Sequence, residues 1–254
     1  MTELDVIDSS QLEVRDIRKS FGGVAVLNGI SLHADLGRVT SLIGPNGAGK
    51  STLANIISGY VRPDSGRVRF AGSDITGKRV HQRAQLGLGR TFQNLELFAG
   101  LSVAENVVLG RYRSARRRWI TGPSQSDRDQ ARTALDNLSL TAQRNDDVGS
   151  LSFGRAKMVE PARVLVADPS IIVMDEPAAG LSSNRSAELG AWIRGFVSPA
   201  TGVVLIEHDM RLIMSISDYI YVLDHGVMIA EGTPDVVRKD AKVREAYLGT
   251  SDEE

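Results

Sequence analysis

The stretch Gly44-Pro45-Asn46-Gly47-Ala48-Gly49-Lys50-Ser51-Thr52 decides the fold of this chain. Its order of Gly, four residues, Gly, Lys and Ser is typical of a loop that binds a phosphate chain between a strand and a helix. The context fits, because an apolar run at residues 39–43 precedes it and a helix-like run at residues 53–58 follows. The sequence therefore predicts an α/β protein built around a phosphate-binding loop.

The residue types in this stretch suit a polyphosphate ligand. Glycines let backbone N–H groups turn toward an anion without a Cβ in the way, and the helix that follows points its positive dipole end at the same place. We expect Lys50 to lie across the terminal phosphates and the hydroxyl of Ser51 to hold Mg²⁺. The alternative is a glycine-rich strand-to-helix turn that binds nothing.

A second stretch, Ile171-Ile172-Val173-Met174-Asp175-Glu176, carries two carboxylates. Its apolar residues predict a strand buried on both faces, and the carboxylates fall at the C-terminal end, where open α/β sheets place their ligands. We expect Asp175 to hold Mg²⁺ through water, completing the shell begun by Ser51. Glu176 would then orient and deprotonate an attacking water, which predicts an enzyme that hydrolyses a nucleotide.

Two more residues become candidates because of the phosphate loop. Phe21 lies in a turn between strand-like runs at residues 12–17 and 24–32 and could stack on an adenine base; the alternative is an ordinary core residue. His208 follows the strand-like run at residues 203–206 and could contact the γ-phosphate or hold Glu176 and the water in line. The alternative for His208 is a structural histidine.

Composition limits the classes of partner. The 254 residues carry 30 basic and 31 acidic side chains, a net charge of −1, so overall charge favours neither nucleic acid nor an anionic membrane. The absence of cysteine excludes disulfides and thiolate metal sites. Residues 1–10 are not expected to be a signal peptide, and no apolar run reaches the roughly 18 residues that span a bilayer. We therefore expect any membrane role to come through another chain.

The pattern along the chain predicts a single domain with an insertion. We expect residues 1–94 and 166–233 to form the core, about 95–165 to form a helical subdomain because strand signals vanish there, and 234–250 to form short C-terminal helices. We expect a core of mixed or parallel sheet, an N-terminal antiparallel β subdomain and an inserted helical subdomain. Five arginines between residues 111 and 118 predict a solvated face or a contact with lipid headgroups or an acidic partner.

The motifs together resemble the nucleotide-binding subunits of ATP-binding-cassette transporters. In chain order, the resemblance is carried by the phosphate loop, Gln93, Leu151-Ser152-Phe153-Gly154-Arg155, Asp175-Glu176 and His208. It covers nearly the whole chain and implies ATP as the nucleotide, Mg²⁺ as the cofactor, and ATP hydrolysis coupled to transport. It also implies that Gln93 senses Mg²⁺ and links the site to the helical lid and to a membrane partner.

The resemblance further implies a head-to-tail dimer. ATP at one chain's phosphate loop would be covered by Ser152, Phe153 and Gly154 of a second ABC ATPase chain, either an identical or a similar one. Integral membrane permease subunits are implied as partners, with a solute-binding protein involved indirectly and nucleic acid not involved. The implied location is peripheral, on the cytoplasmic face of a bacterial inner membrane.

Within that family, four stretches are similar to the ATPase subunits that drive bacterial uptake of branched-chain amino acids: Arg90-Thr91-Phe92-Gln93-Asn94, Glu176-Pro177-Ala178-Ala179-Gly180-Leu181, Ile206-Glu207-His208-Asp209-Met210 and Ala246-Tyr247-Leu248-Gly249. The resemblance implies import of such amino acids or of related small polar solutes, although the cargo rests on analogy alone. The alternatives are the ATPase of a lipopolysaccharide-type extraction system and a soluble cassette ATPase outside transport.

Three residues depart from the family pattern. Arg155 replaces the usual glutamine and brings a positive charge towards a partner's triphosphate. Pro161 falls inside the expected helix, and because an interior proline costs roughly 3 kcal/mol, we expect a break or shift near residues 157–160. Ser182 stands where many relatives carry aspartate, so the resemblance gives little basis for expecting communication between the two sites. We still expect hydrolysis, with the site that this chain completes on its partner as the slower one.

Overall fold

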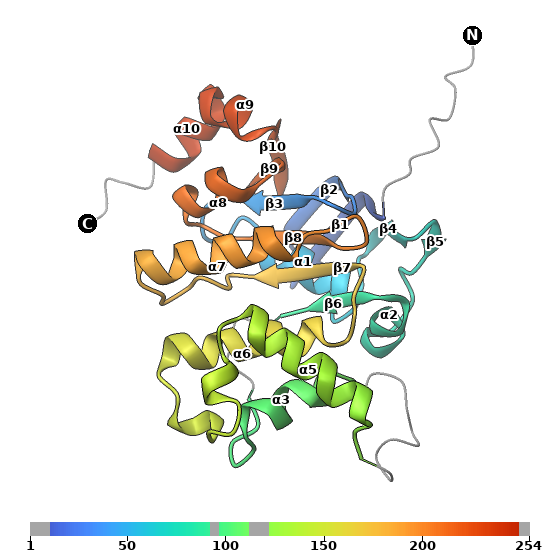
Figure 1. Ribbon diagram of the computed structural model, residues 1–254. Coiled ribbons are helices and arrows are strands. Elements are labelled where there is room, and N and C mark those ends of the chain that lie inside the picture. Colours follow the sequence, from blue (N-terminus) through green and yellow to red (C-terminus); the bar gives the residue numbers. More distant parts are fainter. Residues whose placement is uncertain (1–10, 92–96, 112–121, 249–254) are drawn as a thin grey trace.

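The computed structural model describes residues 11–91, 97–111 and 122–248 (Figure 1). The strands are β1 Leu12–Phe21, β2 Val24–Ala34, β3 Val39–Ile43, β4 Ser65–Phe70, β5 Ser73–Asp74, β6 Leu88–Arg90, β7 Ile171–Asp175, β8 Gly202–Ile206, β9 Tyr219–Asp224 and β10 Val227–Gly232. The helices are α1 Lys50–Ser58, α2 Val80–Leu86, α3 Val103–Leu109, α5 Gln125–Asn137, α6 Phe153–Leu165, α7 Ser183–Phe196, α8 Met210–Ile216, α9 Pro234–Lys239 and α10 Ala241–Leu248. Two 3₁₀ turns are η2 Thr141–Gln143 and η3 Val148–Ser150.

These strands form two sheets. The N-terminal sheet has the order β2-β1-β4-β5, and its paired strands are antiparallel. The larger sheet has the order β10-β9-β3-β8-β7-β6. Its β10–β9 pair is antiparallel, and the pairs from β9 to β6 are parallel. The predicted α/β class, with a mixed core sheet and an N-terminal antiparallel sheet, is therefore confirmed.

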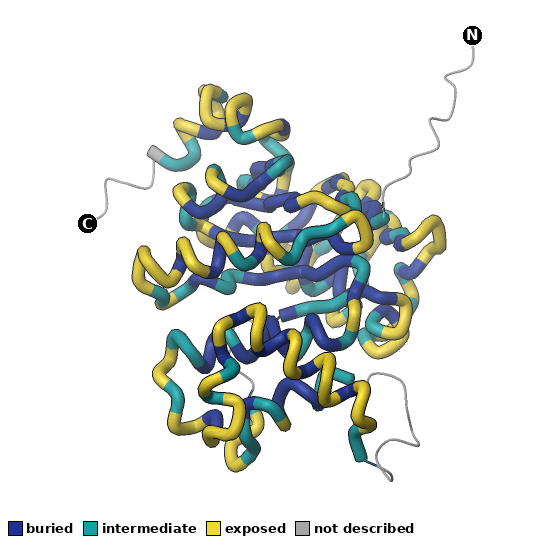
Figure 2. The backbone as a smooth tube through the Cα atoms, viewed as in Figure 1, coloured by how far each residue is buried: buried dark blue, intermediate teal, exposed yellow. Residues whose placement is uncertain are grey.

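Alternation along the central strands places side chains on both faces of the larger sheet. In β7, Ile171 and Val173 join the core between the two sheets, whereas Ile172 and Met174 join the core on the opposite face. Helix α1 fills the first core, and α7 and α8 cover the second. Figure 2 shows the central strands coloured mainly as buried, whereas the surrounding helices alternate between buried and exposed positions. Because both faces are covered, the strand reads as the continuous apolar run seen in the sequence.

The helices α3, α5 and α6 pack against one another below the β6–β7 side of the sheet (Figure 1). We call residues 97–165 the helical region. Its described helices match the helical spacing found in the sequence, while most of the arginine-rich run lies outside the described residues. The exact domain boundaries stay a prediction.

Helix α6 corrects one expectation. The break expected near residues 157–160 is wrong, because α6 runs from Phe153 to Leu165 with Pro161 inside it. The proline removes one N–H donor, but Val159, Pro161 and Ala162 are buried against neighbouring elements. Tertiary packing of a buried helix face supplies most helical stability, and here it holds the helix across the missing bond.

Candidate nucleotide site

The phosphate loop, residues 44–52, connects β3 to α1 and is fixed by close packing. Gly44 and Gly49 have φ values of 154° and 104°. A Cβ on Gly44 would lie 2.0 Å from the carbonyl oxygen of Leu223, and one on Gly49 would lie 2.7 Å from the side chain of Leu27. Only glycine fits both conditions, so β2 and β9 clamp the loop into one shape.

Lys50 is the first residue of α1 and is 5% exposed. Its ammonium donates to the carbonyl oxygens of Gly44 at 2.7 Å and Pro45 at 2.9 Å. Burial lowers the pKa of Lys50, while the charges of Glu176 and Asp175 oppose that shift. A cavity of about 300 Å³ opens beside it, lined by Val26, Asn46, Gly47, Gly49, Lys50, Ser51, Thr52 and Glu176. The fold thus brings Glu176 to the phosphate loop across more than 100 residues of sequence.

Asp175 ends β7 and is 3% exposed. Arg90 donates to its Oδ2 at 3.1 Å and to the amide oxygen of Asn55 at 2.7 Å. The other oxygen, Oδ1, is buried with no hydrogen-bond partner among the described residues. Burial raises the pKa of Asp175, and Arg90 opposes that shift. A buried carboxylate oxygen with no hydrogen-bond donor among the described residues fits a hard cation such as Mg²⁺.

Glu176 occupies a strained backbone position. Its φ is 47°, in the left-handed region that a non-glycine residue rarely adopts. Its N–H donates to the carbonyl oxygen of Ile206 at 2.8 Å, which ties it to the end of β8. His208 follows the same strand, and its Nδ1 lies 4.0 Å from the Glu176 carboxylate. The imidazole is 56% exposed, so it can still meet a ligand.

The predicted trans segment, Ser152, Phe153 and Gly154, begins α6 and stays outside this cavity among the described residues. Ser152 has the backbone conformation of an N-cap, but its hydroxyl makes no cap hydrogen bond. The Phe153 side chain is 55% exposed. Arg155 donates to Gln143 at 3.0 Å within its own chain, and its approach to a partner's triphosphate stays a prediction.

Two other predicted residues have different outcomes. Phe21 ends β1, is 49% exposed and belongs to neither buried core, so the alternative of a core residue is wrong. The ammonium of Lys19 lies 5.2 Å from the centre of its ring. Gln93 lies outside the described residues, together with the rest of residues 92–96.

Three charged residues near the site were not assigned a role from the sequence: Arg90, Lys157 and Glu207. Arg90 holds Asp175, and the other two contact the loop that follows β7. Glu207 could have been found, because a carboxylate directly after a buried apolar strand repeats the pattern of Asp175. Arg90 and Lys157 carry no comparable signal, since their contacts join segments far apart in sequence.

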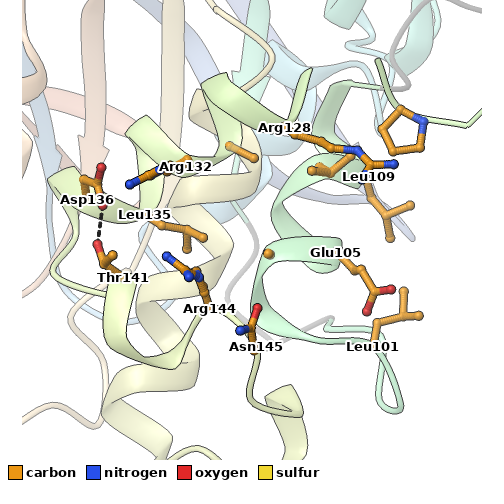
Figure 3. A pocket seen from close by; sticks show the side chains of 14 residues that line it. Leu101, Glu105, Leu109, Arg128, Arg132, Leu135, Asp136, Thr141, Arg144 and Asn145 are labelled. Carbon is orange, nitrogen blue, oxygen red and sulfur yellow. Dashed lines mark hydrogen bonds between the residues drawn. The ribbon is translucent and has the colours of Figure 1, made fainter. Parts of the chain in front are cut away.

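A larger cavity, of about 680 Å³, lies in the helical region between α3 and α5 (Figure 3). Its walls combine apolar side chains, such as Leu101, Leu109 and Leu135, with charged ones, such as Arg128 and Arg144. None of the predicted nucleotide-site residues lines it. Cavity size alone would therefore misplace the chemistry.

A cavity shared by the phosphate loop, the ammonium of Lys50 and the carboxylate of Glu176, with Asp175 buried at the end of β7, is typical of an enzyme that binds and cleaves a nucleoside triphosphate. Comparison with known families narrows this class. The family model described as ABC transporter matches residues 27–179, and the chain belongs to that family. A shorter model, described as branched-chain amino acid ATP-binding cassette transporter, matches residues 227–253.

Relatives of known name extend over almost the whole chain. BraF of Pseudomonas aeruginosa, a high-affinity branched-chain amino acid transport ATP-binding protein, is 38% identical over 94% of this chain and 97% of its own. LivG of Escherichia coli, described in the same words, is 36% identical with the same coverage. Methanocaldococcus jannaschii has a probable LivG that is 34% identical over 94% of this chain and 97% of its own.

Solved structures agree with the fold. An ABC transporter cassette in its ADP conformation has a TM-score of 0.84 at 32% identity, covering 94% of this chain and 99% of its own. A nucleotide-free cassette has a TM-score of 0.83 at 33% identity, covering 94% and 98%. The chain is thus an ATP-binding ATPase of the kind that works with membrane permease subunits. Within its described residues, no helix has the length and apolarity to cross a membrane.

Proposed function

We propose that this chain hydrolyses ATP to drive the uptake of branched-chain amino acids, or of related small polar solutes, through integral permease subunits. The shared cavity of the phosphate loop and Glu176 is the observation that carries the enzymatic part. The cargo is supported by the names of the relatives and by the match at residues 227–253, which includes Ala246-Tyr247-Leu248-Gly249.

Binding begins with the triphosphate at the phosphate loop. The ammonium of Lys50 is already oriented by two carbonyl oxygens, and its third N–H is available for the terminal phosphates. The amides of residues 46–52 surround the remaining oxygens at the start of α1. Phe21 stacks on the adenine base from the end of β1, where its ring is half exposed.

Ser51, Asp175 and Gln93 are the residues that would hold Mg²⁺. Oxygen ligands are the type that Mg²⁺ prefers, and one carboxylate combined with substrate phosphates is a common arrangement for this ion. The bond from Arg90 fixes one oxygen of Asp175 and leaves the other directed elsewhere, which supports this role. When bound, Mg²⁺ neutralises charge that develops on the phosphate oxygens.

Glu176 acts on the water that attacks the γ-phosphate. Its carboxylate accepts the water's proton. The hydrogen bond from its N–H to Ile206 fixes the position of the Glu176 backbone beside β8. His208, 4.0 Å from the carboxylate, orients the glutamate and the γ-phosphate relative to each other. These two residues come from neighbouring strands, so the sheet sets their separation.

A second cassette chain covers the nucleotide. The exposed Phe153 and the uncommitted Ser152 hydroxyl support a contact made with another molecule rather than within this chain. In this arrangement Ser152 and Gly154 reach the γ-phosphate bound by the partner, at the start of α6. Either an identical chain or a similar ATPase can provide the opposite half.

The enzymatic part is tested by Glu176→Gln. Glutamine keeps the size of the side chain but cannot accept the proton, so turnover falls by roughly two orders of magnitude or more while ATP affinity is kept. Steady-state phosphate release and ATP binding measure the two effects. Glu188→Gln on the exposed face of α7 is the control and leaves both unchanged. Unchanged turnover in Glu176→Gln removes this residue from its role.

The transport part places the chain peripherally at the cytoplasmic face of the membrane. Affinity purification of the chain from membranes tests this. Integral permease subunits together with an amino-acid-binding protein support the proposal, whereas lipopolysaccharide-export components, ribosomes or DNA contradict it.

A further inference from the structure

The loop of residues 176–180, which follows β7, carries Glu176 in a conformation that must be imposed from outside. A non-glycine residue at a φ of 47° persists only where its surroundings determine the backbone. The bond from the Glu176 N–H to Ile206 fixes the start of the loop. The rest is held by two buried charged side chains from other parts of the chain.

Lys157, on α6, holds the loop from one side. It is 7% exposed, and its ammonium donates to the carbonyl oxygen of Ala179 and, at 3.4 Å, to that of Glu176. The ammonium also lies 5.7 Å from the centre of the Phe153 ring. Burial lowers the pKa of Lys157, and the charges of Glu207, Glu160 and Glu176 oppose that shift. A buried cation needs such acceptors, so loop and lysine depend on each other.

Glu207 holds the loop from the other side. It is 1% exposed and accepts hydrogen bonds from the N–H of Ala178 at 2.6 Å and of His208 at 3.2 Å. Carbonyl oxygens of the loop therefore face Lys157, while an amide of the same loop faces Glu207. The two side chains fix the loop in both hydrogen-bonding directions.

We propose that Lys157 is a positioning residue for hydrolysis, which holds the backbone of Glu176 and connects it to the helix that begins with Ser152, Phe153 and Gly154. The inference rests on the proposed function, in which Glu176 acts on water. Its consequence is that one buried ammonium connects the loop that carries Glu176 to the segment of residues 152–154 within a single chain. A shift of α6 on meeting a partner's nucleotide displaces the carbonyl contacts of this chain's own Glu176.

Lys157→Met tests the inference, because methionine fills similar space without donors. We expect kcat for ATP hydrolysis to fall about 10- to 100-fold, as small misplacements of a reacting group do. KM and ATP affinity stay within about twofold, since Lys157 touches no substrate. Lys157→Arg, which keeps a donor cation, retains more of kcat than Lys157→Met. Lys157→Gln is the second variant if Lys157→Met does not fold, with the same expected loss.

The control is Arg194→Met in the last turn of α7, which removes a cation paired with Asp218 at 2.6 Å. It is expected to lower the melting temperature without changing kcat. The inference is overturned if Lys157→Met and Lys157→Gln keep kcat within about twofold of the unmodified chain, or if Arg194→Met loses as much kcat as they do. Glu176→Gln, measured alongside, distinguishes a failure of this inference from a failure of the proposed function. If it loses turnover while the Lys157 variants keep theirs, only this inference fails; if it keeps turnover, the proposed function fails.

Discussion

Two parts of the molecule are proposed to contact the nucleotide, the phosphate loop and the segment of residues 152–154. They differ in how many contacts already hold them within this chain. The phosphate loop is held in one shape by close packing against neighbouring strands, and its buried Lys50 is already bonded to two carbonyl oxygens of the same loop. The segment of residues 152–154 is exposed at the start of α6, and the Ser152 hydroxyl has no cap bond.

We infer from this difference that nucleotide binding and nucleotide hydrolysis depend on different parts of the molecule. A loop whose shape is fixed before the ligand arrives loses little entropy on binding, so we expect one chain to hold the triphosphate without a partner. Under the proposed function, residues 152–154, which do not line that cavity, act only on a nucleotide bound by a second chain. Variants of the loop should therefore change binding in a single chain, whereas variants of α6 should leave that binding intact.

The largest effect is expected for Lys50→Ala in the phosphate loop. The variant removes the ammonium that is proposed to contact the phosphates, together with its bonds to Gly44 and Pro45. Because charge-assisted hydrogen bonds to phosphate are strong, ATP affinity should fall by roughly 100-fold or more. Fluorescence titration with a labelled ATP analogue measures it. Lys239→Ala at the exposed end of α9 is the matched control. Undiminished affinity in Lys50→Ala contradicts the phosphate-loop assignment.

A smaller effect is expected for Phe21→Ala at the end of β1, where the adenine base is proposed to stack. Base stacking on an aromatic ring contributes about 1–3 kcal/mol, which corresponds to a loss of ATP affinity of roughly 5- to 150-fold. Binding of tripolyphosphate, which has no base, should be unaffected. Val24→Ala, an exposed position at the start of β2, is the control. Equal losses for ATP and tripolyphosphate would show that Phe21 supports the loop instead of the base.

The smallest effect is expected for Pro161→Ala in α6, the helix that follows Ser152. Alanine restores an N–H inside α6, and the gain of up to about 3 kcal/mol is partly offset by the smaller buried side chain. We expect a melting temperature a few degrees higher, roughly 2–6 °C, with ATP affinity unchanged. Pro234→Ala, at the first turn of α9 where proline is well tolerated, should bring no such gain. A lower melting temperature for Pro161→Ala would mean that packing of the ring outweighs the missing bond.

The sequence was sufficient for the parts of the site whose chemistry is local. The phosphate loop between β3 and α1, and the carboxylates at the end of β7, follow from residue type and spacing over fewer than a dozen positions. The antiparallel β1–β2 pair around Gly22 and Gly23 was predicted in the same way.

The parts that sequence reasoning missed depend on contacts between distant segments. Neither the bond from Arg90 to Asp175 nor those from Lys157 to the 176–180 loop has a local pattern, because the fold creates them. Short strand β6 was not predicted, since its pairing with β7 gives it its form. Pro161 misled the analysis for the same reason: propensity favoured a break, and burial of α6 overrode it.

The central claim is that the loop of residues 44–52 holds a triphosphate that a second chain then covers. A crystal structure of the Glu176→Gln variant with ATP and Mg²⁺ tests it most directly. The account predicts the phosphates along the loop amides with Lys50 on the terminal groups, the base against Phe21, and Ser152 and Gly154 of a second chain on the γ-phosphate. A loop filled by the protein's own side chains, or nucleotide bound elsewhere, such as between α3 and α5, would contradict it.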